Sequence, residues 1–197
     1  MNLTKKQRKK LTELYPFLIP RNVFTDEIPE NYDYDYIRGE GEIPFGWRRL
    51  FFMYCKKIRP ILSEYNLLDN YRFNQLKEKY GTLRIYDNAA PAKIHILNSL
   101  YSCFANYICQ RCGQFANFET SGWVESICEN CYNKENINNY SDCTLYKLKI
   151  PSHYTCEYYD SKQNHFYKEN YTYRYLKTEY TRIKDMTDEE FYQYLIE

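Results

Sequence analysis

Motifs of the common catalytic families are missing from this sequence of 197 residues. It contains only six glycines, and none of them belongs to a phosphate-binding glycine loop. With three histidines in the chain, there is no His-Glu-x-x-His motif, and there is no nucleophile elbow. Acid pairs such as Asp33 and Asp35 lie in a segment without regular periodicity, which does not favour general acid–base catalysis. We therefore expect a protein that is not an enzyme.

Long apolar segments are also missing. No run approaches the roughly 18 apolar residues that a membrane-spanning helix needs. Residues 1–20 are basic, and their short apolar cluster is interrupted by Pro16 and Pro20, unlike a secretory signal. Without an export signal, eight cysteines favour a metal site in a reducing compartment over a disulfide framework. We expect a cytoplasmic protein that makes no membrane contact.

A strong net charge is missing too, since the formal value is only +1, but the charges lie in blocks. Residues 1–21 carry six basic residues against one acid, residues 22–43 carry seven acids against one arginine, and residues 44–84 carry nine basic residues against three acids. Such blocks either pair within the fold or leave a basic face for an anionic partner. The candidate partner-binding residues are cations of the 44–84 block: Arg48, Arg49, Lys56, Lys57, Arg59 and Arg84.

What the chain does contain is a four-cysteine motif made of two Cys-x-x-Cys pairs. The ligand candidates are Cys109, Cys112, Cys128 and Cys131. This spacing is typical of a zinc site, in which a tight turn directs two sulfurs at one ion about 2.3 Å away. Four thiolates fill a tetrahedral ion and leave no position for water or substrate, so the predicted cofactor is a structural Zn²⁺ and not a catalytic one.

The residues around the cysteines predict a zinc ribbon or a treble-clef-like knuckle. Gly113 follows the first pair, where a knuckle needs a residue that can adopt positive φ. Phe115, Phe118, Ser121–Gly122 and Trp123 indicate two short strands joined by a turn. A second, weaker metal site or a Cys–His pair would involve Cys143, His153, Cys156 and His165. Cys55 and Cys103 lie on apolar helix stripes, where packing is the expected role.

The regular elements expected over residues 1–132 are helices and one segment of strand character. A basic helix over 4–15 should end at Pro16, and residues 21–44 should form an acidic loop. The stripe Trp47, Phe51, Tyr54, Ile58, Ile61 and Tyr65 predicts a helix that Pro60 either kinks or divides. Residues 71–86 have strand character with a turn or bulge at Gly81. A further helix begins near Pro91, with the core stripe Ile94, Leu97, Tyr101, Phe104 and Ile108.

Residues 133–197 are expected to form a strand-rich extension with a C-terminal helix. Strand character is found over 144–150 and 165–176, and the tyrosines of 171–175 either stack nucleic-acid bases or belong to a half-buried strand. Thr187 and Glu190 form a capping-box pattern before the last helix. The predicted fold class is α+β, with a body and four-cysteine knuckle over 1–132 and the extension over 133–197.

The motifs together resemble a family of small four-cysteine zinc-knuckle proteins from phages and bacterial mobile elements. The resemblance covers roughly residues 15–132 and rests on Tyr15-Pro-Phe-Leu18, Pro20-Arg-Asn22, Tyr32-Asp-Tyr34, Gly46-Trp-Arg48, Lys77-Glu-Lys-Tyr-Gly-Thr-Leu-Arg84, Asp87-Asn88, Cys109-x-x-Cys-Gly113, Gly122-Trp123 and Cys128-x-x-Cys131. This uncharacterised family implies no enzyme activity, and small phage proteins of this kind are often inhibitors of host defence, including anti-CRISPR proteins.

Two functions follow as expectations. The first is a non-enzymatic, zinc-stabilised binding protein that inhibits a host defence nuclease or a ribonucleoprotein such as a CRISPR effector, in the cytoplasm of the host cell. The alternative is a regulator that binds DNA or RNA through its zinc knuckle. Affinity for free nucleic acid separates the two, because a regulator should bind naked nucleic acid tightly whereas an inhibitor should need its protein partner.

Overall fold

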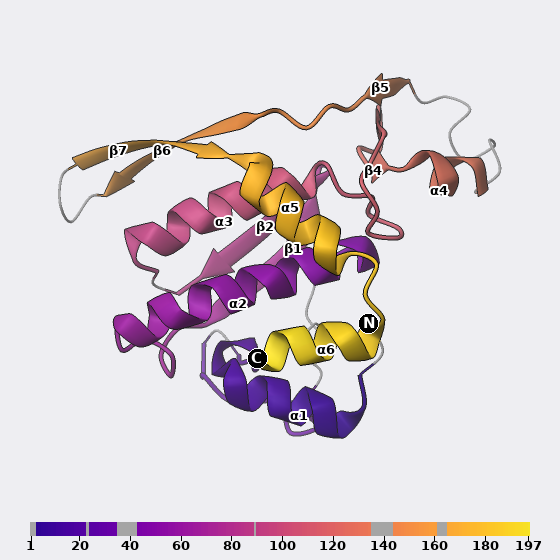
Figure 1. The fold of residues 1–197 in the computed structure, drawn as a ribbon. Coiled ribbons are helices and arrows are strands. Elements are labelled where there is room, and N and C mark those ends of the chain that lie inside the picture. Colours follow the sequence, from indigo (N-terminus) through magenta and orange to yellow (C-terminus); the bar gives the residue numbers. More distant parts are fainter. Residues whose placement is uncertain (1–2, 23, 35–42, 89, 135–143, 161–164) are drawn as a thin grey trace.

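The structure is a computed structural model that describes residues 3–22, 24–34, 43–88, 90–134, 144–160 and 165–197, with the backbone alone over 153–160 and 165–172. Helices form the body, and the described strands pair into three small antiparallel sheets (Figure 1). The predicted α+β class is therefore confirmed. Among the described helices, none combines the length and apolar character that a bilayer crossing needs.

Helix α1 (Lys5–Leu14) forms where the basic N-terminal helix was expected. The Thr4 side chain caps it in a capping box with Gln7, and the helix ends before Pro16, which begins the short 3-10 helix η1 (Pro16–Leu18). α1 lies beside the C-terminal helix α6 (Asp188–Ile196) (Figure 1). The Thr187–Glu190 capping box predicted at the start of α6 is confirmed.

Helix α2 (Arg48–Glu64) is the central element of the body, and the 3-10 helix η2 (Phe45–Trp47) precedes it. Pro60 lies inside α2, so it does not divide the segment into two helices. Pro60 is exposed, and it removes one backbone N–H donor from the hydrogen-bond ladder of the helix. α2 packs against helix α3 (Ala92–Ala105), which begins after Pro91 as expected.

The segment predicted as strand over 71–86 is a hairpin of β1 (Phe73–Lys79) and β2 (Thr82–Asp87). Tyr80 and Gly81 form its two-residue turn, with φ of 53° and 73°. Two successive positive φ values define the type I′ turn, whose twist matches that of paired strands. In Figure 1 the hairpin lies behind α2 and α3.

The strand expected over residues 165–176 is shorter than predicted, because a helix begins inside it. Strands β6 (His153–Asp160) and β7 (His165–Thr172) form a two-stranded ribbon, and helix α5 (Tyr173–Ile183) follows at once. Tyr173, Leu176 and Tyr180 are buried at helical spacing, which favours the helix. Tyr173 and Tyr175 consequently do not extend an aromatic ladder on a sheet face.

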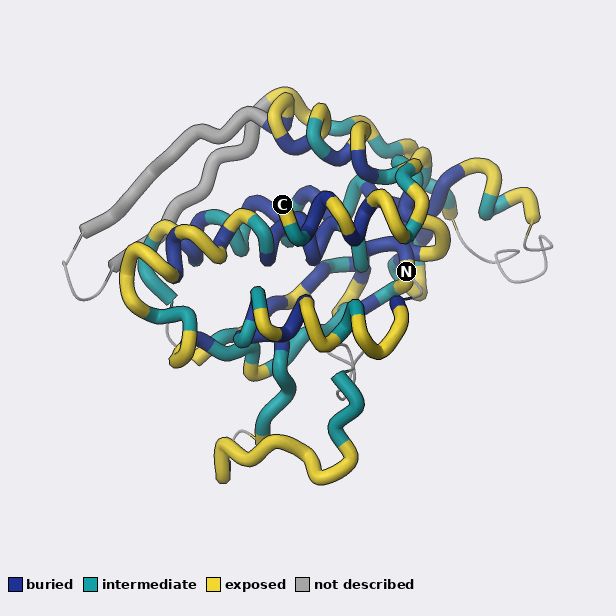
Figure 2. Tube along the Cα trace, turned by 60° about the horizontal axis from the view of Figure 1, so that its bottom comes forward, coloured by how far each residue is buried: buried dark blue, intermediate teal, exposed yellow. Residues whose placement is uncertain are grey.

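The core is shared by both predicted parts of the chain. Buried residues of α2 and α3 belong to the same cluster as those of α5 and α6, so a boundary at residue 132 does not divide the core (Figure 2). The residues of the two predicted stripes belong to this cluster or pack against it, except Tyr65, which is 50% exposed. The rings of Tyr54 and Tyr101 lie 5.3 Å apart between centroids. Phe104 extends the core toward α5, with ring contacts to Tyr173 and Tyr180.

Replacing Phe104 by alanine should lower the free energy of unfolding by about 3–5 kcal/mol, the range for a buried aromatic side chain. Phe104 is 0% exposed, whereas Phe24 is 94% exposed, so Phe24→Ala is a control of the same residue type. Denaturant unfolding followed by circular dichroism measures both. Equal unfolding midpoints for Phe104→Ala and wild type would show that this face is not core.

Candidate metal centre

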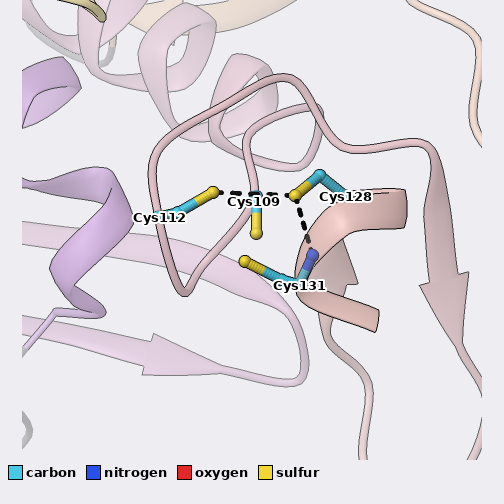
Figure 3. Close-up of side chains that lie close together, drawn as sticks. All are labelled: Cys109, Cys112, Cys128 and Cys131. Carbon is cyan, nitrogen blue, oxygen red and sulfur yellow. Dashed lines mark hydrogen bonds between the residues drawn. The ribbon is translucent and has the colours of Figure 1, made fainter. Parts of the chain in front are cut away.

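The four predicted ligands lie together, with their sulfur atoms pointing toward one another (Figure 3). Every Sγ atom of Cys109, Cys112, Cys128 and Cys131 lies within 4.8 Å of the other three, and the Sγ atoms of Cys112 and Cys128 are 3.6 Å apart. Four sulfurs at 2.3 Å from one tetrahedral ion would be about 3.8 Å apart. The group is therefore positioned to hold a single metal ion with its four thiolates.

The first two ligands belong to a knuckle directly after α3. Ile108 and Phe115 form an isolated β-bridge that closes this loop. Within it, the Cys109 N–H donates to the Gln114 carbonyl at 2.7 Å, and the Gly113 N–H donates to the Cys109 carbonyl at 3.0 Å. Gly113 has a φ of 81°, as the sequence predicted for the residue after the pair.

The second pair is carried by a short hairpin and the helix after it. Strands β3 (Phe118–Thr120) and β4 (Ser126–Ile127) pair with each other, and β5 (Leu145–Lys147) pairs with the other edge of β3. Cys128 follows β4, and Cys131 lies in helix α4 (Glu129–Lys134). The Cys131 N–H donates to the Cys128 sulfur at 3.4 Å. The sequence predicted either a zinc ribbon or a treble-clef-like knuckle. A knuckle, a hairpin and a helix that begins between the last two ligands form the treble-clef-like arrangement.

Burial opposes the ionisation of two of these thiols in the absence of a cation. Burial raises the pKa of Cys109 to about 11. Burial and a hydrogen bond with Cys112 also raise the pKa of Cys131. Burial acts in the same direction on Cys128, but hydrogen bonds from Cys131 and from the other thiols lower its pKa below the ordinary value. A bound cation would compensate for the mutual repulsion of four thiolates, which links metal binding to release of protons.

The knuckle is held against the start of α2 by its backbone. The Gly46 N–H donates to the Gln110 carbonyl at 2.9 Å, and Trp47 Nε1 donates to the Ile108 carbonyl at 3.0 Å. A Cβ atom at Gly46 would overlap the carbonyl oxygen of Cys109 and lie 2.6 Å from the Gly113 nitrogen. Glycine is therefore required at position 46 for this close approach.

Helix α5 and the residues after it hold the other side of the knuckle. The Tyr180 hydroxyl donates to the Gly113 carbonyl at 2.7 Å, and burial raises the pKa of Tyr180, which keeps the hydroxyl protonated. Gln114 hydrogen bonds to Asp185 at 2.6 Å and accepts from Lys184 at 2.9 Å. The sequence did not predict these partners, because they lie about 70 residues away along the chain.

The hairpin between the cysteine pairs is stabilised by polar contacts. Arg111 and Glu125 form a two-point ion pair, with Arg111 Nη2 3.1 Å from Glu125 Oε2. The Thr120 hydroxyl donates to the Trp123 carbonyl at 2.6 Å and accepts from the Glu125 N–H at 2.9 Å. Gly122 has a φ of 75° and turns the chain, and the side chain of Trp123 is 79% exposed.

Three of the six predicted contact cations donate to carbonyls at helix C-termini. Arg49 Nη1 donates to the carbonyls of Ile183 and Lys184 at the end of α5, at 2.6 and 3.2 Å. Lys56 Nζ donates to the Tyr194 carbonyl near the end of α6, and Arg59 Nε donates to the Leu14 carbonyl at the end of α1, at 2.8 Å. A cation at a helix C-terminus donates hydrogen bonds to carbonyls that have no helical partner, and it interacts favourably with the negative end of the helix dipole. Burial also lowers the pKa of Lys56.

Of the other three predicted cations, Lys57 and Arg84 are exposed and Arg48 is half-buried. Arg48 stacks over the Phe45 ring at 5.4 Å from its centroid, and exposed Lys57 lies over the Tyr175 ring at 5.2 Å. Arg84 is exposed on β2. Described acids of the 22–43 block pair instead with the N-terminal block: Arg8 with Asp33 at 3.9 Å and Arg21 with Asp26 at 3.2 Å.

The remaining candidates are packing groups or lie outside what the structure describes. Cys55 is buried in α2 and Cys103 is partly buried in α3, which agrees with their predicted packing role. Cys143 lies outside the described residues, and the side chains of His153, Cys156 and His165 do as well.

The sequence did not indicate one further polar group, at the end of β2. The Tyr71 hydroxyl donates to the Asp87 carboxylate at 3.3 Å. Burial raises the pKa of Asp87, while the charge of His95 acts in the opposite direction. This group brings together Tyr71, which lies two residues before β1, the end of β2 and the start of α3, so His95 has a structural role here.

No family model, curated protein or solved structure matches this chain. The fold and the site themselves define an α+β protein with a body of helices and a treble-clef-like group of four cysteines that could hold a metal ion.

Neighbouring lysines of α2 should differ in their effect on stability. Lys56→Gln should lower the free energy of unfolding by about 1–2 kcal/mol, because it removes a charged donor from a helix C-terminus. Lys57→Gln should change it by no more than about 0.5 kcal/mol, as for an ordinary surface position. Chemical denaturation of the two variants measures the difference. Equal stability of both would mean that the contact of Lys56 with α6 contributes nothing.

Proposed function

We propose that this protein is a non-enzymatic, zinc-stabilised binding protein that acts by occupying a macromolecular target. Following the resemblance, the proposed target is a host defence nuclease or ribonucleoprotein, with a CRISPR effector as one example, in the cytoplasm of the host cell. The observation that supports binding over catalysis is the donor set of the metal centre. Four thiolates complete a tetrahedral coordination shell, so a bound ion has no open position for substrate or water.

Zinc is the proposed ion because of the donors and their geometry. Four cysteine sulfurs in a tetrahedral arrangement suit Zn²⁺ or an iron centre among the metals common in proteins. Paired Cys-x-x-Cys ligands on a knuckle and a helix are typical of structural zinc. The centre also lies where η2, α3 and α5 meet, which supports a folding role for the ion.

The electrostatics of the knuckle favour this proposal over a zinc-knuckle regulator of DNA or RNA. Between Cys109 and Cys131 the chain carries one basic residue, Arg111, against three acids, Glu119, Glu125 and Glu129. The single arginine is paired with Glu125. A nucleic-acid-reading knuckle needs cations to neutralise phosphates, and this one has an excess of acids.

The metal proposal predicts one zinc per chain and a marked loss of thermal stability when a chelator removes it, since metal binding contributes to folding. Cys112→Ser should lower both the zinc content and the melting temperature, whereas Cys103→Ser, away from the centre, should keep one zinc. Elemental analysis and thermal melts with and without chelator measure this. An iron signal in place of zinc, or unchanged metal content in Cys112→Ser, would contradict it.

The binding proposal is tested by titration. The zinc-loaded chain is used to capture its target from a host lysate, and the target's activity is then measured at increasing ratios of protein to target. We expect activity to fall in proportion and to reach its minimum near one equivalent, as for an occupying inhibitor. Complete loss at a small fraction of one equivalent, increasing with time, would indicate turnover and overturn the proposal.

A further inference from the structure

The β1–β2 hairpin has one face in the core and one face in solvent. Leu83 and Ile85 are buried and Leu76 packs against the core, and these residues alternate with their neighbours along the strands. The register pairs Lys77 with Arg84, Gln75 with Tyr86 and Lys79 with Thr82. Paired residues of an antiparallel ladder share a face. The outer face therefore consists of Gln75, Lys77, Lys79, Thr82, Arg84 and Tyr86.

The outer face carries positive charge without an acid among its six residues. Lys77, Lys79 and Arg84 lie on it, and the Arg84 side chain has no hydrogen bond or ion pair with any residue that the structure describes. Glu78, the acid of these strands nearest the turn, belongs to the opposite face, where its carboxylate accepts a hydrogen bond from the Gly81 N–H. The charge of this face is thus available to an anionic partner.

Exposed aromatic rings accompany these cations. Tyr86 is 47% exposed and Tyr80, at the turn, is 77% exposed. Lys77 Nζ lies 5.3 Å from the Tyr86 ring centroid, and Lys79 Nζ lies 5.4 Å from that of Tyr80. Each exposed ring therefore has an ammonium group beside it.

A third exposed ring is brought to the end of this face by the metal-centre hairpin. A Cβ atom on Gly81 would lie 2.5 Å from Val124 Cγ1, so the β1–β2 turn and the 120–125 turn touch. Tyr80 and Trp123 are the residues just before these two contact positions, and both are more than three-quarters exposed.

The surface is also held rigidly before any partner arrives. Asn98 of α3 donates to the Ile85 carbonyl at 2.9 Å, and the rings of Phe73 and Phe51 pack 5.3 Å apart at the start of β1. A preorganised surface loses less conformational entropy on binding. Proteins that bind single-stranded nucleic acid use aromatic rings to stack on the bases and cations to contact the phosphates. This surface offers both kinds of group.

We propose that the outer face of β1–β2, with Tyr80 and Trp123 at its end, binds single-stranded nucleic acid. Lys77, Lys79 and Arg84 contact phosphates, and Tyr86, Tyr80 and Trp123 stack on bases. An acidic peptide would neutralise the cations but has no flat π faces for three exposed rings, whereas every base has one. The inference rests on the proposed function, because the strand that it names is the nucleic-acid component of a ribonucleoprotein target. Affinity for a free oligomer should therefore stay in the non-specific range of about 1–100 μM, whereas a regulator would bind naked nucleic acid more tightly.

The test measures anisotropy of fluorescent 12-mers of oligo(dT) and oligo(U) with the zinc-loaded full chain, over a range of salt. We expect binding by at least one of them, and the tighter one identifies DNA or RNA as the source. The triple variant Lys77→Gln, Lys79→Gln and Arg84→Gln should weaken binding more than tenfold. It should also reduce the slope of log K against log salt by about 2, since each phosphate contact on a single strand contributes about 0.7.

The aromatic variants separate stacking from charge. Tyr86→Ala and Trp123→Ala should each weaken binding by about tenfold with an unchanged salt slope, because stacking does not release counterions. The matched control for charge is the triple variant Lys6→Gln, Lys9→Gln and Lys177→Gln, which removes three exposed lysines from α1 and α5. It should retain affinity within about twofold. Zinc content and melting temperature show that each variant is folded.

Three results would overturn the assignment. The first is no binding of either oligomer up to about 100 μM, the weak end of non-specific affinity. The second is a loss of affinity in the control triple variant equal to that in the hairpin triple variant. The third is tighter binding of a 12-base-pair duplex, with an affinity that the aromatic variants leave unchanged. A chain that fails in this way but still inhibits its captured target at one equivalent would leave the proposed function standing. A chain that binds the oligomers but turns over its target would retain this surface and lose the proposed function.

Discussion

The close approach of the Gly46 backbone to the cysteine knuckle is the contact on which the rest of the structure depends. It brings the start of α2 against Cys109 and Gly113, and Tyr180 of α5 donates to the Gly113 carbonyl from the other side. These backbone groups are in register only if the knuckle keeps its shape. A metal ion held by four thiolates would fix that shape and would thereby support the helical core without taking part in it.

Positive charge on α2 serves a second structural purpose. Arg49, Lys56 and Arg59 reach the C-termini of α5, α6 and α1, where backbone carbonyls have no helical partner. One helix thus orders the ends of three others by charge-assisted hydrogen bonds. Half of the six cations that the sequence suggested for partner binding therefore make contacts within the fold.

Local patterns predicted what depends on near neighbours in the chain. The cysteine pairs, the apolar stripes of α2 and α3, and the Thr187 capping box are all set by short spacings. Helix α5 could not be predicted in the same way, because over 171–176 the alternation of a strand and the spacing of a helix coincide. The choice is made by distant contacts, such as the ring of Tyr173 against Phe104 at 5.4 Å. The partners of the α2 cations could not be predicted for the same reason, because 45 to 138 residues separate each cation from its carbonyl partner along the chain.

The cations of the 44–84 block divide according to the element that carries them. On α2, Arg49, Lys56 and Arg59 donate to carbonyls at the C-terminal ends of α5, α6 and α1. On the hairpin, strand alternation sends the apolar residues inward and therefore sends Lys77, Lys79 and Arg84 outward together. No register shift could redirect them without exposing Leu83 and Ile85. The packing that stabilises the hairpin is thus also what concentrates charge and aromatic rings on its outer face.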